Sequence, residues 1–170
     1  KPISNATQTA LNAKASATLG TVVLTTSGTS ALFPIPAGAK RIDVSFSEVS
    51  FSGITVPLIQ IGTGGVPDTT GYLGSGADLI GNVAVNRTDG FPLGTNFAAA
   101  TVVQGVVSLV LVDPATNTWA ISGSVGASNT AQIYWTAGRK ILSGVLDIVR
   151  ITSSAGASFD LGKINVLVTS

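Results

Sequence analysis

The chain has 170 residues, of which 45% are hydrophobic and 10% charged, and its formal net charge is +1. This length fits one domain, or one domain with a short appendage. Because the chain has neither Cys nor His, disulfides, thiol nucleophiles, thiolate or His-based metal sites and His-dependent catalytic triads are excluded.

The low charge needs an explanation, since an ordinary globular domain has about 25% charged residues. No run of 18 apolar residues exists, so neither a transmembrane helix nor membrane insertion is expected. Contact between subunits explains the deficit better, because interface cores are depleted of charge. The basic residues are scattered, with no cluster larger than the pairs Lys40-Arg41 and Arg139-Lys140, so nucleic acid is not an expected partner.

The first element predicted is a short helix over residues 3–16, rich in Ala and with Ser4 placed to cap its first turn. An isolated helix of this length is marginal in water. We therefore divide the chain into a helical linker, 1–18, and a β-domain, 19–170. The chain begins at Lys1 without Met or a leader, so we expect it to be a piece of a longer polypeptide.

Short strands are predicted from residue 21 onward. Residues 21–26 and 30–35 form a hairpin or two successive strands. In 41–53 the apolar alternation changes phase after Phe46, which predicts a bulge near Ser47-Glu48. Residues 56–62 form another strand. Between 62 and 94 the chain is rich in Gly, Asp, Asn and Pro, and only 82–86 suggests a strand.

The remaining strands are predicted in pairs. Residues 102–126 form a hairpin around the turn DPATN, 131–142 form two short strands around AGR, and the chain ends in a hairpin around SSAGAS. Residues 106–112 are apolar at both odd and even positions, so both faces of this strand are apolar. One face should pack on the core and the other on a second sheet or another subunit. The whole predicts an all-β, antiparallel, jelly-roll-like β-sandwich.

The loop aspartates Asp68, Asp78 and Asp89 could converge as a glycosidase pair or hold calcium. We favour the simpler interpretation that they form turns through bonds to their own backbone. No catalytic residue, cofactor or metal is predicted. The Gly-rich stretches have no P-loop Lys after them, so phosphate binding is not predicted.

The aromatic residues divide by strand parity. Trp119, and Trp135 with Ile133, are predicted to be core, whereas Tyr134 falls on the opposite, exposed face. Sugar recognition needs an aromatic face and polar side chains that fix orientation. The candidate binding residues are Tyr72, Asn86, Arg87, Asp89, Phe91, Asn96 and Tyr134. The alternative that they only pack the loops stays open.

Several stretches are similar to tail fibres of tailed bacteriophages. KPISNATQTALNAKAS resembles the linker before their head or shaft segments. Five later stretches resemble, in the same order, the C-terminal domain of these fibres: IPAGAKRIDVSFSEVSFSG, GYLGSGADL, GFPL, NTWAISGSV and LDIVRITSSAGASFDLGKINVLV. The likeness covers nearly the whole chain. Each motif has low specificity by itself, and none is a catalytic signature.

The resemblance implies a homotrimeric fibre tip, extracellular on the virion, that binds a bacterial surface polysaccharide, lipopolysaccharide or outer-membrane protein. Three copies of the weak helix would then share their Ile3, Ala6, Ala10 and Leu11 faces about an axis. We expect the loops 62–79 and 86–98 to form the receptor surface, because loops on a rigid scaffold tolerate change. A glycan-cleaving enzyme that uses the loop aspartates and a purely structural virion or adhesin module are the alternatives.

Overall fold

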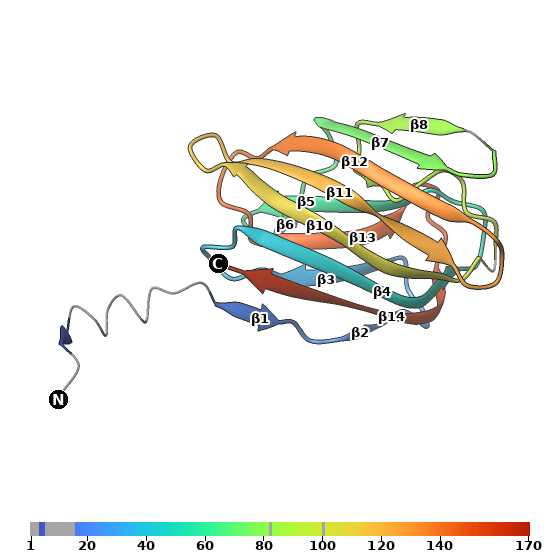
Figure 1. Ribbon diagram of the computed structural model, residues 1–170, viewed down its shortest axis with the longest axis horizontal. Helices are drawn as coiled ribbons and strands as arrows, with labels where there is room; N and C mark the ends of the chain where they lie inside the picture. Colours follow the sequence, from blue (N-terminus) through green and yellow to red (C-terminus); the bar gives the residue numbers. More distant parts are fainter. Residues whose placement is uncertain (1–3, 6–15, 82, 100) are drawn as a thin grey trace.

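The protein is all-β and is built from two antiparallel sheets, as the computed structural model shows for residues 4–5, 16–81, 83–99 and 101–170. The larger sheet faces the viewer in Figure 1 and the smaller one lies behind it. This two-layer arrangement is consistent with the predicted β-sandwich. The predicted helix falls almost wholly on residues outside this described part, and Ala17 and Thr18 of the predicted linker belong to a strand instead.

The larger sheet has nine strands in the described part of the chain. Their spatial order is β1 (Ala17–Leu19), β14 (Phe159–Thr169), β4 (Arg41–Phe51), β10 (Val103–Asp113), β11 (Thr118–Ala127), β12 (Ile133–Ile141), β7 (Tyr72–Asp78) and β8 (Ala84–Arg87), with β2 (Val23–Leu24) also beside β14. The smaller sheet has the order β3 (Ser30–Pro34), β13 (Ile148–Ser153), β5 (Pro57–Thr63) and β6 (Val66–Pro67), with β9 (Phe91–Pro92) also beside β5.

The bulge predicted in β4 is confirmed. Glu48 has a φ of 56°, and the register of β4 against β10 shifts there, from Phe46↔Gly105 to Val49↔Val103. Gly162 of β14, with a φ of 95°, lies against the backbone of Glu48, where a Cβ atom would collide. The bulge moves the buried positions from Val44 and Phe46 to Val49 and Phe51, so both halves of the strand bury apolar side chains.

The hairpin predicted around SSAGAS is wrong because its two strands belong to different sheets. After Ser153 the chain leaves the smaller sheet, where β13 pairs with β3 and β5, and β14 pairs with β4 in the larger sheet. For residues 21–26 and 30–35 the alternative of two successive strands is confirmed, because β2 pairs with β14 and β3 pairs with β13. The hairpin of β10 and β11 is confirmed, and Asp113 accepts a hydrogen bond from the backbone of Ala115 in its turn.

The two short strands predicted over 131–142 are one continuous strand, β12. Gly138 was expected to form a turn, but it lies in mid-strand. A Cβ atom there would come within 2.7 Å of the backbone oxygen of Leu73 and 2.8 Å of the Phe91 ring. Glycine therefore permits close approach of β7 and β9, and the strand continues through it.

The core lies between the sheets and contains the buried Trp119, as predicted. Strand β10 buries Val107 and Leu109 on this side, while Val106, Val110 and Val112 on its outer face are exposed. The expectation that a second sheet covers the outer face is wrong. Cover by another subunit stays a prediction.

The two ends of the molecule differ. At the end where the N-terminal segment leaves, Ser170 N–H donates to Ser16 O (3.0 Å) and Lys40 N–H to Thr169 O (2.8 Å). The loops after β4, β7, β11 and β13 lie at the opposite end (Figure 1).

The described part of the chain contains no helix long and apolar enough to cross a membrane.

Candidate functional site

Two adjoining hollows lie along β7 and β8, at one edge of the larger sheet, and share Ser75. The first has a volume of about 260 Å³ and is lined by Tyr72, Leu73, Gly74, Ser75, Asn86, Arg87 and Thr88. The second, of about 170 Å³, is lined by Ser75, Gly76, Ala77, Ala84, Trp135, Thr136 and Ala137. Together they join a polar hollow to an apolar groove.

Trp135 is the exposed aromatic residue of the apolar groove, with 41% of its surface open to solvent. Its neighbours across the strands are Ser124 on β11 and Ala77 on β7, and Ala77 in turn pairs with Ala84 on β8. These side chains are too short to cover an indole ring. A large aromatic surface is therefore held on a rigid sheet and left uncovered.

The next row of side chains supplies hydrogen-bonding groups. Ala137, Ser75 and Asn86 lie side by side on β12, β7 and β8. Ser75 Oγ donates to Asn86 Oδ1 at 2.8 Å, which fixes the orientation of the amide. Asn86 is exposed, so its amide group faces solvent on the same sheet face as the indole, two strands away and one row along.

An ion pair closes the polar hollow at the sheet edge. Arg87 contacts Asp89 through two hydrogen bonds, Nε to Oδ1 at 2.8 Å and Nη2 to Oδ2 at 2.6 Å. These bonds hold the pKa of the Asp89 carboxyl below its usual value and raise the pKa of Arg87. The backbone oxygen of Asp89 accepts from Gln60, whose side-chain oxygen accepts from Arg150 at 2.6 Å.

A second ion pair lies beneath the first hollow. The Lys140 ammonium is 2.8 Å from Asp68 Oδ2 and 5.2 Å from the centre of the Tyr72 ring. The Lys140 side chain is 8% exposed and that of Asp68 is 32% exposed. Tyr72 accepts a hydrogen bond from Ile61 N–H (2.8 Å) and donates to Ile61 O (2.9 Å). Its burial raises its pKa well above the usual value.

The structure separates the seven candidate binding residues into three groups. Tyr72, Phe91 and Tyr134 are buried, so none of them offers a ring face to a ligand. The expected exposure of Tyr134 is wrong, and burial raises its pKa. Asn86 and Arg87 line the first hollow at the β7–β8 edge, and Asp89 pairs with Arg87 there. Asn96 is exposed but lines neither hollow.

The prediction that Trp135 is a core residue is also wrong. Strand β12 buries Tyr134, Thr136 and Lys140 and exposes Ile133 and Trp135. Its sequence places three large apolar residues, Ile133, Trp135 and Ile141, on the face that proves to be exposed. Counting apolar residues on each face therefore predicted the opposite orientation of the strand. The signal for the buried face was Gly138, a position where the neighbouring backbone and the Phe91 ring leave no room for a side chain.

The loop aspartates all have structural partners. Asp68 pairs with Lys140 and Asp89 with Arg87. Asp78 accepts from Gly81 N–H at 2.7 Å and from Thr95 Oγ1 at 2.5 Å. No three acidic side chains of the described residues lie close enough together to hold a metal ion. Asp78 thus bonds the backbone of its own turn, as the favoured interpretation predicts, whereas Asp68 and Asp89 pair with cationic side chains.

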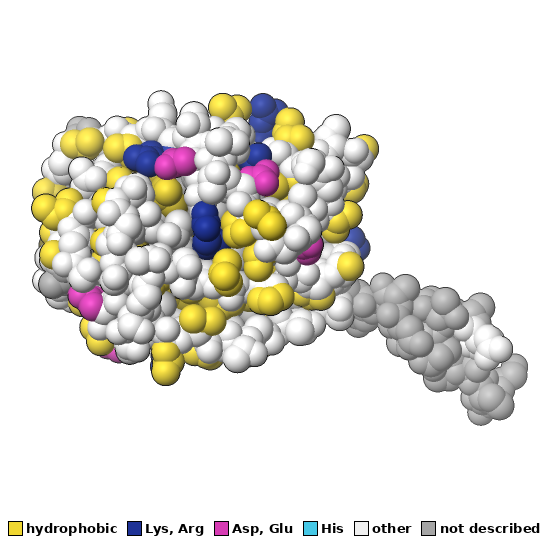
Figure 2. All heavy atoms as spheres, turned by 180° about the vertical axis from the view of Figure 1, so that it is seen from behind, with side chains coloured by type: hydrophobic (Ala, Val, Ile, Leu, Met, Phe, Trp, Pro, Cys, Tyr) yellow, Lys and Arg dark blue, Asp and Glu magenta, His cyan; other side chains and the backbone are white. Residues whose placement is uncertain are grey.

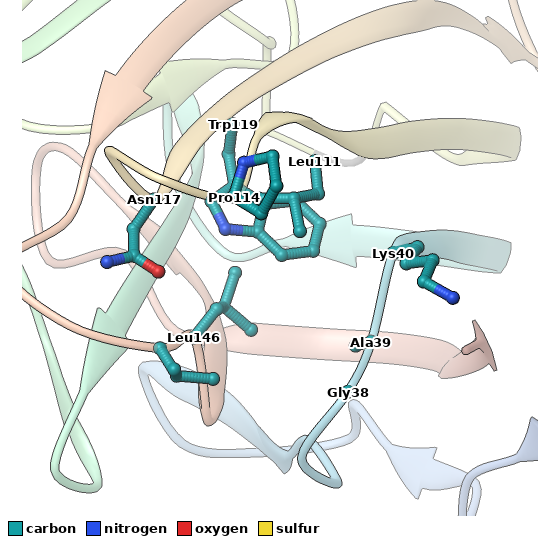
Figure 3. Close-up of a pocket in the computed structure, with 9 residues that line it drawn as sticks. Gly38, Ala39, Lys40, Leu111, Pro114, Asn117, Trp119 and Leu146 are labelled. Carbon is teal, nitrogen blue, oxygen red and sulfur yellow. The ribbon is translucent and has the colours of Figure 1, made fainter.

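A third cavity opens at the end where the N-terminal segment leaves (Figure 3). It has a volume of about 240 Å³ and is lined by Gly38, Ala39, Lys40, Leu111, Pro114, Asn117, Trp119, Val145 and Leu146. The lining is almost entirely apolar, and the Lys40 ammonium points away from it (Figure 3). Asn117 contributes the only amide side chain of its lining, so the cavity offers few groups to orient a polar ligand.

Comparison with known proteins identifies no relative: no family model, curated protein or solved structure matches the chain.

Proposed function

We propose that this chain is the receptor-binding head of a bacteriophage tail fibre, which binds a glycan on the bacterial surface without cleaving it. In this proposal the head is a jelly-roll-like sandwich, the N-terminal segment is a helical stalk, and three copies form the extracellular tip of the virion. The resemblance of the sequence motifs to phage tail fibres supports the proposal.

The observation that carries glycan binding is the exposed indole of Trp135 on the same sheet face as the Ser75–Asn86 pair. The flat face of an aromatic ring packs against the CH groups of a pyranose, and an adjacent amide can fix the sugar hydroxyls. The alanines around Trp135 leave room for a sugar ring to lie on the indole. In this proposal the receptor surface is the sheet face at β7, β8 and β12. It includes parts of the predicted segments 62–79 and 86–98, but as strands instead of loops.

A shallow site of this kind binds one sugar weakly. Three sites on one particle gain avidity because the second and third contacts form at a high effective concentration. The rigid sheet limits the ordering cost of binding. The mechanism is therefore multivalent and non-covalent, with no covalent step for the protein to catalyse.

The test compares Trp135→Ala with Ile133→Ala as a matched control. Ile133 lies two residues away on the same strand, is similarly exposed at 40%, and lines neither hollow. We expect Trp135→Ala to weaken binding to an array of bacterial surface oligosaccharides at least about ten-fold, equivalent to ~1.4 kcal/mol, and Ile133→Ala to leave it unchanged. Equal binding by both variants would refute the site.

Two further measurements separate the alternatives. Labelled wild-type protein that binds no strain in a broad bacterial panel would favour a purely structural module. Release of oligosaccharide from purified surface polysaccharide, lost in Asp89→Asn, would favour a glycan-cleaving enzyme.

A further inference from the structure

A long stretch of the sequence has no charge, and it forms one edge of the molecule. Between Lys14 and Lys40 no residue is acidic or basic. Within this stretch, residues 17–24 hold β1 and β2 at the edge of the larger sheet, and residues 30–34 form β3 at the edge of the smaller sheet. We call residues 17–24 and 30–34 the uncharged edge.

The uncharged edge exposes large apolar side chains. Leu19 is 68% exposed, Leu24 69% and Leu32 50%, and Val22 is also exposed. In Figure 2 the lower edge nearest the N-terminal segment shows only yellow and white side chains. Contiguous apolar surface of this kind marks a contact site more often than a solvated one.

The backbone at this edge is open as well. Strands β1 and β2 pair with β14 on one side, and no described strand pairs with them on the other. Proteins usually protect such an edge with charged side chains or proline, because an open edge recruits further strands. Strands β1 and β2 contain neither, and in β3 the sole such residue is Pro34, the last of the strand. An edge with so little of this protection is suited to being covered.

A cleft lies directly beside the exposed leucines. It has a volume of about 330 Å³, and Leu19, Val23, Leu32, Phe33 and Val166 are among the residues that line it. The edge therefore combines projecting apolar side chains with a hollow of matching chemistry. A projection on one copy that fits a hollow on the next copy generates a closed ring when the rotation closes.

The position of the edge indicates which copies could cover it. Strand β1 starts one residue after Ser16, whose backbone oxygen accepts from Ser170 N–H. If three N-terminal segments meet about an axis, as the proposed function requires, the residues that follow them directly lie nearest to that axis. The uncharged edge is that surface.

We infer that the uncharged edge is the contact between copies of this chain, with the leucines of one head packed against the cleft of the next. The inference rests on the trimer of the proposed function and assigns its surface. The outer face of β10 is a weaker candidate. Its exposed valines adjoin the Arg41–Asp43 ion pair, which also bonds Ser108 and keeps charge on that face.

The experiment places charge on the edge of the whole chain. Across the strand pairs the charged neighbours of the edge are cations, Lys163 beside Leu24 and Arg150 beside Leu32. Leu19→Lys combined with Leu32→Lys therefore adds like charge to a surface that would have to lose water. Ile54→Lys is the matched control, because Ile54 is 68% exposed like Leu19 and lies in the loop after β4.

Sedimentation at a series of concentrations measures the result. We expect wild type and Ile54→Lys to sediment as trimers of the 17.0 kDa chain, and the double variant to need a concentration about 100-fold higher or more to assemble. A double variant that assembles like wild type would overturn the inference. A monomeric wild type at micromolar concentration would overturn both the inference and the trimer.

Hydrogen exchange gives a readout that does not depend on the variants folding. In wild type, amides of residues 17–24 should exchange more slowly as concentration rises through assembly, whereas amides near Ile54 should not change. If the exchange rates of residues 17–24 did not change with concentration either, the result would contradict the inference. A trimer with a protected edge that binds no bacterium would leave the inference standing and refute only the proposed receptor function.

Discussion

The two edges of the larger sheet are built in opposite ways. The β8 edge carries two ion pairs, Arg87–Asp89 and Lys140–Asp68, together with the exposed Asn86. The β1–β2 edge has no charged residue of its own and exposes Leu19 and Leu24. One edge carries the charged side chains that usually protect an open sheet edge, and the other is left apolar. The first edge is therefore suited to solvent, and the second is the edge to which the inference above assigns a partner.

The edges also differ in how they are attached to the core. At the β8 edge, Tyr72 reaches between the sheets and bonds both backbone groups of Ile61 on β5. Its ring meets that of Phe91 edge-on, with centroids 4.9 Å apart. At the other edge a single buried hydroxyl, Thr25 Oγ1, donates to Leu161 O at 2.8 Å. The polar edge is thus tied to both sheets, whereas the apolar edge is tied mainly to β14.

The largest expected effect comes from breaking the buried ion pair of the polar edge. Asp68→Asn removes the anion that faces the Lys140 ammonium, which stays almost fully buried. An uncompensated buried charge is strongly destabilising, so we expect the free energy of unfolding to fall by about 3 kcal/mol. Chemical denaturation measures it.

The matched control is Asp89→Asn at the same edge. The Arg87–Asp89 pair is partly exposed, so its loss should cost less than about 1 kcal/mol. Lys140→Met added to Asp68→Asn should recover most of the lost stability, because no buried charge is left. If Asp68→Asn and Asp89→Asn lower the free energy of unfolding equally, the Lys140–Asp68 pair stabilises the polar edge no more than the exposed Arg87–Asp89 pair does.

The next effect is the response of the polar edge to alkaline pH. Burial raises the pKa of Tyr72 in the folded protein above 10.0, its value in the unfolded chain. Stability from this group is therefore complete below pH 10 and is lost as pH rises above it, by about 1.4 kcal/mol per pH unit. The pKa of Tyr134 is raised in the same direction, so both tyrosines contribute to the decline.

Tyr72→Phe separates the two contributions. It should cost about 2 kcal/mol at neutral pH, because Ile61 N–H is left buried without a partner. Above pH 10 its stability should fall less steeply than that of wild type, since of the two tyrosines only Tyr134 is left with a raised pKa. Urea denaturation at a series of pH values gives both numbers. An unchanged slope in Tyr72→Phe would show that Tyr72 does not titrate in this range.

Local features of the fold were predictable from the sequence. The phase change after Phe46 identified the bulge at Glu48, and DPATN identified the turn between β10 and β11. Both depend on neighbouring residues only. The connections that cross between sheets, such as the one after Ser153, were not predictable, because a turn sequence does not say which sheet receives the next strand.

The candidate site was predictable only where its residues are close in sequence. Asn86, Arg87 and Asp89 lie within four positions and do meet at the β8 edge. The aromatic residues failed because their burial depends on distant segments. Gly94 packs against the Tyr134 ring, and the segment around Phe91 closes over Tyr72. Those contacts bury one face of β12 and leave Trp135 on the other.

The smallest expected effect on stability comes from a buried hydrogen bond at the apolar edge. Thr25 is 1% exposed, and Thr25→Val keeps its shape but leaves Leu161 O without its donor, at a cost of about 1 kcal/mol. Thr152→Val is the control, since Thr152 donates the same kind of bond to Thr29 O at 2.9 Å in an exposed position and should be nearly neutral. Because β2 carries part of the uncharged edge, Thr25→Val should also weaken assembly slightly. Loss of stability in Thr25→Val with assembly unchanged in sedimentation would show that β2 is not part of the contact.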